Sequence, residues 1–489
     1  MDRALSRRRF VGLGMAAAGA TLVAACSQQT AQPTSAPQPS GNTSSGGSAP
    51  AAQPTTAKPT QAAASGAQPT QAPAAQAGNS NASGNIRWQF RGSADDLKNA
   101  QKFVDDTFAK DHSSIKVTIE PAPDSRDEKL IASMVAGTAP DVFESWTDNV
   151  TQFADRGQVM DVDPLVKRDY KADDLKDFYA WQWRDFVLPS HIRFGLPKYV
   201  NVMFTWYNKD MFDKAGVKPP TEDWTHDDYA QAAIKLTTKN GSNVDTWGLY
   251  YPVWSWDRYW YKIDAWGGHV VDPNDSAKAT FDSDQALAAF EWVRKLMWDD
   301  KGMAQRLLLA GAGQSFSSLD LFASGKFAMV EDGFYPFAMA KSVQKKINWA
   351  YQHTPKGPVQ RKVLGTTDGF VMWKNSKAPD AAWELLKYLA GPDYQRNQVK
   401  STGLLPVRTS VLADWKKICI QAYPELEAVN LDVGPKAMEM GYPGNRMLFK
   451  KDAEARQIIT PALEKVFVSG STPVTYFKDI VKQVNDKMM

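Results

Sequence analysis

Aromatic side chains gather at one place in the chain where no helical or strand period accounts for them. Between residues 250 and 266 lie Trp254, Trp256, Trp260, Trp266, Tyr250, Tyr251, Tyr259 and Tyr261. Flat aromatic faces beside polar groups suit sugar rings, whose C–H faces are apolar and whose edges carry hydroxyls. They suit core packing equally well. The sequence therefore leaves open whether this cluster faces a ligand or fills a core. Three other tryptophans, Trp292, Trp298 and Trp383, sit in helical patterns beside apolar residues and are expected in the core.

Signatures of catalysis are missing from the sequence. It contains no G-x-S-x-G, H-E-x-x-H or C-x-x-C segment, and its 5 His are widely scattered. The segment 324–327 resembles a phosphate-binding loop but lacks the upstream glycine and the Ser or Thr after the lysine. Asp161 and Asp163 could serve acid–base chemistry, but Pro164 and the surrounding polarity favour a surface turn. Calcium is disfavoured there, because only two of the about six to eight oxygen ligands that it takes are visible. We expect no catalytic residue, no metal site and no cofactor.

The first 26 residues predict export from the cytoplasm. A twin-arginine segment, residues 6–11, precedes a short Gly/Ala-rich apolar run that ends at Cys26. The run is too short to cross about 30 Å of hydrocarbon comfortably. Small residues before Cys26 resemble a bacterial lipobox, which predicts lipidation of Cys26 and a membrane anchor. The alternative is an ordinary secretory signal in which Cys26 has no special role.

Residues 27–85 predict a disordered linker. They consist almost wholly of Ala, Gln, Pro, Thr, Ser, Gly and Asn, and Lys58 is their only charge before the first predicted strand. Such a segment buries too little apolar surface to offset the entropy lost on ordering. It therefore predicts a tether between an anchor and a folded part.

The remaining chain, from Ile86 onward, is too long for one compact core and suits two lobes. The net charge of +3 and the absence of a basic stripe argue against nucleic acid as a partner. The chain has only 2 Cys, so acylation of Cys26 would leave Cys419 with no disulfide partner. Stability must then come from packing.

Alternating strand and helix patterns open the folded part. We expect strands at 86–90, 115–119 and 141–143 and helices at 95–110 and 127–135, which together predict a parallel sheet covered by helices. Ligands bind such sheets beyond the carboxyl ends of the strands, here Arg91–Ser93 and Glu144–Asp148.

A second α/β region follows. We expect strands at 202–207, 326–330 and 369–373, and helices at 227–236, 284–298, 380–389, 452–467 and 477–484. Thr225 is the expected N-cap of the 227–236 helix, with Asp228 three residues further on.

An ordered series of motifs resembles the family 1 extracellular solute-binding proteins of bacterial ABC importers. The series comprises Ala136-Gly137-Thr138-Ala139-Pro140-Asp141-Val142, the segment 207–216 followed by Pro219-Pro220 and Trp224, Trp266-Gly267-Gly268, and the segments 322–329 and 383–389. The resemblance extends essentially from Ile86 to Met489.

The resemblance implies an α/β, two-lobed periplasmic-binding-protein fold of type II-like architecture, with three hinge crossings and the ligand in the cleft between the lobes. By motif position the crossings lie near 198–202, 365–369 and 402–407. Lobe 1 would comprise 86–198 and 370–402, and lobe 2 would comprise 203–364 and 408–489. Hinge closure works because the ligand contacts both lobes only when they are shut.

The resemblance also implies candidate ligand-binding residues by position. They are Arg91, Ser93, Trp146, Asp148, Asn201, Trp254, Trp256, Trp266, Gly267, Tyr335, Asp368 and Arg408, with Phe334 beside Tyr335 and Arg446 as a looser candidate. Relatives of this family carry an acidic residue where this chain has Asn201, so a charge-assisted contact is in doubt there.

The sequence thus predicts a monomeric, lipid-anchored receptor on the outer face of the cell membrane that binds a mono- or oligosaccharide and delivers it to the permease subunits of an ABC importer. One alternative is a binding protein for another solute, such as a peptide or polyamine. A secreted glycan-active enzyme with a carboxylate pair is the other.

Overall fold

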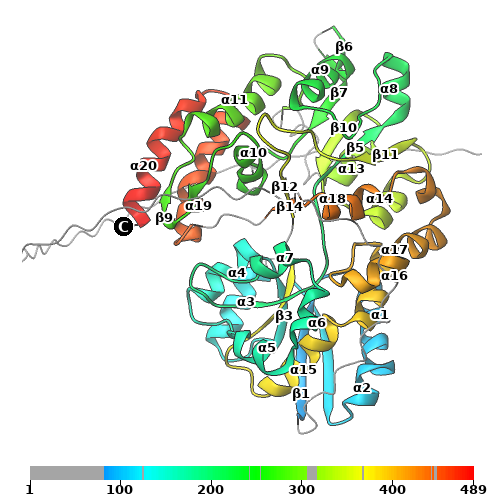
Figure 1. Cartoon of the computed structure of the whole chain (residues 1–489), viewed down its shortest axis with the longest axis vertical. Coiled ribbons are helices and arrows are strands. Elements are labelled where there is room, and N and C mark those ends of the chain that lie inside the picture. The colour runs from blue at the N-terminus through cyan, green and yellow to red at the C-terminus, as the bar shows by residue number, and fades with distance from the viewer. Residues whose placement is uncertain are drawn as a thin grey trace, which may run out of the picture. The chain divides into compact units, whose positions relative to one another are not determined.

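The computed structural model describes residues 82–488 apart from 124–125, 242, 254, 306–316, 366–367, 442 and 445–448, and the backbone alone of Asp148. The signal and most of the linker, including Cys26, lie outside the described residues, as do Trp254 and Arg446. Two separate five-stranded sheets organise the described chain (Figure 1). We call the part built on the first sheet lobe 1 and the part built on the second sheet lobe 2.

The first sheet has the order β2-β1-β3-β13-β4. Its strands are β1 (Gly84–Phe90), β2 (Ile115–Pro121), β3 (Val142–Ser145), β4 (Gly195–Pro197) and β13 (Gly369–Met372). As predicted, β1 pairs in parallel with β2 and with β3. The sheet is nevertheless mixed, because β13 runs antiparallel to β3 and β4. The chain leaves lobe 1 after β4 and re-enters it at the start of β13, so these two neighbouring strands must run in opposite directions.

Helices cover both faces of this sheet. One face packs Trp88 and Phe370 in a core with Val104 of α1 (Ala94–Asp106) and Trp383 of α15 (Pro379–Leu389). The other face has a smaller core around Phe143, built with α3 (Arg126–Val135) and α4 (Thr147–Ala154). The remaining helices of lobe 1 are α2 (Phe108–Asp111), α5 (Asp163–Asp169), α6 (Ala172–Lys176), α7 (Ala180–Asp185) and α16 (Pro392–Thr402).

The second sheet has the order β11-β5-β10-β7-β6. Its strands are β5 (Phe204–Asn208), β6 (Thr238–Asn240), β7 (Asn243–Tyr250), β10 (Phe327–Asp332) and β11 (Trp349–Gln352). Strand β10 is parallel to β7 and antiparallel to β5. It runs two residues past its predicted end, through Glu331 and Asp332. Both carboxylates are buried there because each is paired with a cation.

The helices and short strands of lobe 2 surround this sheet. They are α8 (Lys209–Ala215), α9 (His226–Leu236), η1 (Trp256–Arg258), α10 (Trp260–Ala265), β8 (Val271–Asp272), β9 (Asp275–Ala279), α11 (Asp284–Trp298), α13 (Ser318–Ala323), α14 (Pro336–Val343), β12 (Val363–Leu364), α17 (Thr409–Ala422), η3 (Pro424–Ala428), α18 (Val433–Glu439), β14 (Pro443–Gly444), α19 (Asp452–Leu463), η4 (Glu464–Val468), η5 (Val474–Tyr476) and α20 (Phe477–Met488). The predicted 452–467 helix is thus α19 continued by a π-helical turn. The predicted 95–110 helix is divided at Thr107 into α1 and α2, and the other predicted helices match within a few residues. Thr225 caps α9 with Asp228 in a reciprocal capping box, as predicted.

The cluster at 250–266 is largely a core in this structure. Of its described aromatic residues, Tyr250, Tyr251, Trp256, Tyr259, Trp260 and Tyr261 are buried, and Trp266 is half-buried. Trp256 lies against Phe281 and Phe449, with ring centroids 5.1 and 6.1 Å away. Core packing therefore accounts for these residues better than an exposed ligand-facing surface.

Three chain segments connect the two sheets, and these segments lie side by side. Val200 is bridged to Leu405, and Val202 is bridged to Gly365, so the segments after β4, before β13 and after α16 lie next to one another. The lobes also touch away from these crossings, where α4 of lobe 1 lies against α19 of lobe 2 (Figure 1). The lobes are therefore in contact at the crossings and at a second, separate place.

Candidate functional site

A chain of paired charges lies where the strands of lobe 1 end. Arg91, directly after β1, places its Nη1 atom 2.8 Å from the Oδ1 atom of Asp368, directly before β13. Lys198, directly after β4, places its Nζ atom 2.5 Å from the Oε2 atom of Glu144 in β3. The backbone N–H of Arg91 donates to the same carboxylate at 3.1 Å. The carboxyl ends of β1, β3 and β4 and the amino end of the antiparallel β13 therefore contribute to one polar edge.

Trp146 lies at this edge between two cations. The guanidinium carbons of Arg91 and Arg126 lie 4.8 and 4.7 Å from the centre of its ring. Arg126 is held in place by Asp127 and by a 3.1 Å hydrogen bond to the backbone oxygen of Glu144. An open cavity of about 380 Å³ is lined by Arg91, Gly92, Ala122, Pro123, Arg126, Asp127 and Trp146. The half-buried indole thus faces a solvent-reachable cavity within reach of several polar groups.

Arg91 keeps its charge in this setting. Burial, the largest single influence, lowers the pKa of its guanidinium, but Asp368, Tyr199 and Glu144 together outweigh burial, so the pKa of Arg91 is raised. Its side chain is still 37% exposed. It can therefore donate further hydrogen bonds toward the cavity while remaining paired.

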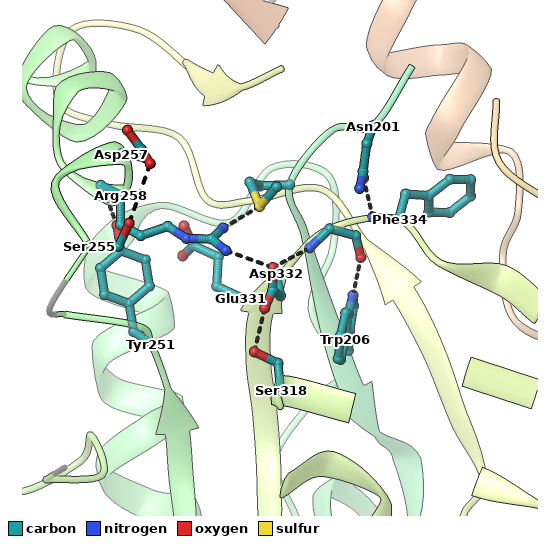
Figure 2. A network of polar contacts seen from close by, with 12 residues as sticks. Asn201, Trp206, Tyr251, Ser255, Asp257, Arg258, Ser318, Glu331, Asp332 and Phe334 are labelled. Atoms are coloured by element: carbon teal, nitrogen blue, oxygen red, sulfur yellow. Dashed lines mark hydrogen bonds and ion pairs between the residues drawn. The ribbon is translucent and has the colours of Figure 1, made fainter. Parts of the chain in front are cut away.

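In lobe 2, Arg258 and Asp332 are the centre of a second polar network, shown in Figure 2. Asp332, the last residue of β10, accepts from Arg258 at 2.8 Å and from the backbone N–H of Gly333 at 2.8 Å, and it also accepts from Ser318. Arg258 also contacts the sulfur of Met203. Burial lowers the pKa of Arg258, yet the pKa is raised overall because the Asp332 carboxylate and the neighbouring tyrosines together outweigh burial. The pair fixes the loop that follows β10.

That loop is tied to the crossing between the lobes. The side-chain Oδ1 atom of Asn201 accepts from the backbone N–H of Phe334 at 2.7 Å. The indole of Trp206 donates to the backbone oxygen of Gly333 at 2.8 Å (Figure 2). Tyr335, next in sequence, is half-buried with its ring 6.2 Å from that of Trp206. These contacts place Asn201 and Tyr335 at the edge of lobe 2 near the first crossing.

A fully buried ion pair lies next to this network. Lys262 and Glu331 are 2% and 0% exposed, with 3.2 Å between the Nζ and Oε1 atoms. Tyr261 donates to the same carboxylate at 2.6 Å and lies 3.0 Å from the hydroxyl of Tyr251. Burial lowers the pKa of Lys262 despite the neighbouring Glu331. Four polar side chains therefore satisfy one another inside lobe 2.

The structure brings some predicted site residues together and not others. Arg91, Trp146 and Asp368 converge at the edge of lobe 1, whereas Asn201 and Tyr335 lie at the edge of lobe 2. Ser93 is engaged as the N-cap of α1, where it forms a capping box with Asp96. Asp148 has no described side chain, and Trp254 lies outside the described residues.

Four of the predicted ligand-binding residues lie in structural contacts instead. Arg408 is buried, donates to the backbone oxygens of Ala390 and Asp174, and lies 3.7 Å from the centre of the Phe178 ring. Trp256 is packed in the core described above. Trp266 lies against His226 and Trp292, and Gly267 has φ of 82° with Val359 beside it. None of these four belongs to the two polar edges.

Sequence reasoning missed several residues of the two edges. Arg126, Lys198, Arg258 and Asp332 were not among its candidate ligand-binding residues, although Lys198 lies in the first predicted crossing. Arg126 had no signal beyond its place just before a predicted helix. Arg258 lies inside the aromatic cluster at 250–266, where the rings, and not the charge of Arg258, suggested ligand binding.

Comparison with known proteins places the chain in a wider group. Residues 92–396 match the model of the bacterial extracellular solute-binding proteins. A binding protein of Brucella abortus is 26% identical over 62% of this chain and 71% of its own length. The maltodextrin-binding protein MdxE of Bacillus subtilis is 21% identical over 65% of this chain and 75% of its own.

Among solved structures, an ABC substrate-binding protein of Listeria monocytogenes in complex with cycloalternan is similar. It has a TM-score of 0.69 and 23% identity, and the match covers 83% of this chain and 98% of that one. At this identity the likeness shows the fold, and it confirms the two-lobed α/β architecture.

Proposed function

Because the chain belongs to the bacterial extracellular solute-binding proteins, we propose that it is the carbohydrate receptor of an ABC importer, binding its ligand between the two lobes and delivering it to the permease. Relatives named for maltodextrin and a structural neighbour bound to cycloalternan support a sugar as the ligand. The observation that carries the proposal is the edge of lobe 1, where Trp146 faces an open cavity beside paired charges.

The pairing of charges favours a neutral, hydroxyl-rich ligand. Arg91, Lys198 and Arg258 each have a carboxylate partner, so the two edges offer donors and acceptors without a large net charge. Hydroxyl groups can use both kinds of partner, and the apolar face of a sugar ring can pack on Trp146. A polyamine would instead require unpaired carboxylates.

The mechanism we propose is hinge closure about the three crossings. In this proposal the crossings divide the chain into lobe 1, residues 86–198 with 370–402, and lobe 2, residues 203–364 with 408–489. Lys198 and Asp368 are fastened to lobe 1 by ion pairs, whereas Asn201 is fastened to lobe 2. The pivot therefore lies between these residues. A ligand that contacts both edges shifts the population toward the closed form.

The proposed location is the outer face of the cell membrane, with lipidated Cys26 as the anchor and the segment between Cys26 and the start of β1 at Gly84 as the tether. Within the described part of the chain, every helix is too short or too polar to cross a bilayer. A Cys26→Ser variant should leave the folded part unchanged and release the protein from membranes in cell fractionation. Its retention there would contradict acylation at Cys26.

The sugar proposal is tested with purified protein and a panel of mono- and oligosaccharides. We expect a saturable thermal shift for at least one sugar, because a ligand that binds only the native state stabilises it. Chromatography of the same mixtures should return the sugar unchanged. Formation of a product would favour an enzyme, and the absence of any shift would exclude the panel as ligands.

A further inference from the structure

A second, more enclosed pocket lies beside the cavity at Trp146. It occupies about 190 Å³ between α1 and α16 and is also lined by the end of β1 and by the first crossing. All of its lining residues belong to lobe 1 or to the crossings. We call it the side pocket. Arg91 lines both the side pocket and the cavity beside Trp146, so its side chain stands between the two spaces.

The lining of the side pocket combines aromatic rings with neutral polar groups. Phe90, Tyr199 and Tyr394 supply the rings, and Gln398 and Ser401 are among the amides and hydroxyls. Apolar faces for C–H groups together with hydrogen-bonding groups for hydroxyls are what a sugar ring requires.

One of these polar groups lacks a partner. Gln398 is 6% exposed, and its Oε1 atom accepts no hydrogen bond from any described residue. Its backbone oxygen, by contrast, accepts from Ser401 at 3.0 Å and from Thr402 at 2.7 Å. A buried amide oxygen without a donor is costly. A hydroxyl of an occupant is the donor that this oxygen lacks.

The charges around the side pocket are already paired, which favours a neutral occupant. The carboxylate of Asp96 accepts from the backbone and hydroxyl of Ser93, Lys198 is paired with Glu144, and Arg91 is paired with Asp368. A charged ligand would have to break one of these pairs, whereas a neutral ligand would leave them intact.

The volume limits the occupant to one ring. A cavity of about 150 Å³ in another protein holds one benzene molecule. The 190 Å³ of the side pocket is therefore of the right order for a single six-membered ring with small substituents.

We propose that the side pocket is a subsite for one neutral sugar ring, the terminal unit of an oligosaccharide whose other units lie in the cavity beside Trp146. This inference rests on the proposed sugar-binding function. It assigns a ligand-binding role to α1 and α16. It also places Arg91 beside the bound oligosaccharide, at the point where the sugar chain enters the side pocket from the cavity beside Trp146.

The test fills the pocket with an aromatic side chain. Ser401→Phe and Asn397→Phe each add a ring from a lining position of α16, and Lys400→Phe adds the same ring on the exposed face of that helix. Calorimetry would use maltotriose, raffinose, mannotriose and stachyose together with glucose, galactose and mannose. Circular dichroism would establish that each variant is folded, and having two filling variants guards against the loss of one.

We expect both filling variants to lose affinity for the preferred oligosaccharide by about tenfold or more. Their affinity for a monosaccharide, and both affinities of Lys400→Phe, should stay unchanged. Unchanged oligosaccharide affinity in a folded filling variant overturns the subsite, as does a native protein that binds a trisaccharide no more tightly than a monosaccharide. A native protein that binds none of these sugars overturns the proposed function instead, and the subsite with it.

Discussion

The two polar edges differ in how their charges are held. In lobe 2, Lys262 and Glu331 are fully buried, and Asp332 is tied to Arg258, Ser318 and a backbone N–H. In lobe 1, Arg91 keeps a substantial exposed surface and lines both cavities. The edge of lobe 2 is therefore satisfied internally, whereas the edge of lobe 1 retains groups that a ligand can use.

Under the proposed hinge closure, this difference divides the work between the two lobes. A buried and satisfied network is rigid, and it fixes the loop that carries Phe334 and Tyr335. An edge with exposed donors and open space can take up a ligand before closure. We expect lobe 1 to supply most of the initial contacts and lobe 2 to supply a preformed wall.

The largest expected effect is the loss of stability when the buried ion pair of lobe 2 is broken. Removing one partner of a buried ion pair leaves an uncompensated charge, so Glu331→Ala should destabilise the protein by about 3–5 kcal/mol. Glu222→Ala is the matched control, because Glu222 pairs with Lys436 at the surface, where water screens the attraction, so its loss should destabilise the protein much less. Urea unfolding measures both, and similar midpoints would remove the contrast between buried and exposed pairing.

The next effect concerns acid stability, which lobe 2 should dominate. Burial lowers the pKa of His353 to about 4, and it lowers the pKa of buried His226 well below its usual range. The unfolded chain binds these protons near pH 6.5, so stability should fall as the pH drops from 6.5 toward 4. For His353 the loss is about 3 kcal/mol, from 2.5 pH units at about 1.36 kcal/mol each.

Urea unfolding between pH 4 and 7.5 tests this origin of the acid sensitivity. His353→Gln cannot titrate, so its stability should vary less with pH than that of the native protein. His191→Gln is the control, because it removes a histidine from an exposed position in lobe 1. If the stability of all three proteins varies equally with pH, groups other than His353 cause the acid sensitivity.

A smaller effect, on sugar affinity, distinguishes the half-buried Trp146 from the buried Trp256. Trp146→Ala should weaken sugar binding by about 1–3 kcal/mol with little loss of stability, because Trp146 is half-buried beside an open cavity. Trp256→Ala should instead cost about 3–5 kcal/mol of folding stability, because it removes a packed core ring. Calorimetry measures the change in sugar affinity, and thermal unfolding measures the change in stability. Unchanged sugar affinity in Trp146→Ala would exclude Trp146 from the ligand-binding site.

The smallest effect lies where the lobes touch away from the crossings. Asp155, at the end of α4, has a raised pKa because of partial burial and because the Glu454 carboxylate of α19 lies near. Proton uptake should therefore favour this contact. Asp155→Asn should strengthen sugar binding at pH 7 by no more than about 1 kcal/mol, and this gain should shrink in acid. Asp105→Asn, on the exposed face of α1, should show no such gain in calorimetry.

The sequence predicted much of the fold because its signals are local. Alternating and helical apolar patterns located β1, β2, α9 and α11, and Thr225 with Asp228 marked the start of α9. The antiparallel entry of β13 was missed, since strand direction depends on where the chain returns from lobe 2. The role of the aromatic cluster could not be predicted from the local sequence either, because a buried ring and a ligand-facing ring have the same sequence pattern.

By itself, the sequence predicted an export signal and a polar tether, and it determined the family and the order of strands and helices, since each depends on residues adjacent in the chain or at a fixed period. Only the tertiary structure decided which charges meet. Arg91 finds Asp368, which lies 277 residues further along the chain, and Arg258 finds Asp332. It also decided that Trp146 is half-buried beside a cavity whereas Trp256 is packed in a core. The physical reason is that burial and charge pairing depend on distances in space, which chain folding sets and sequence separation does not.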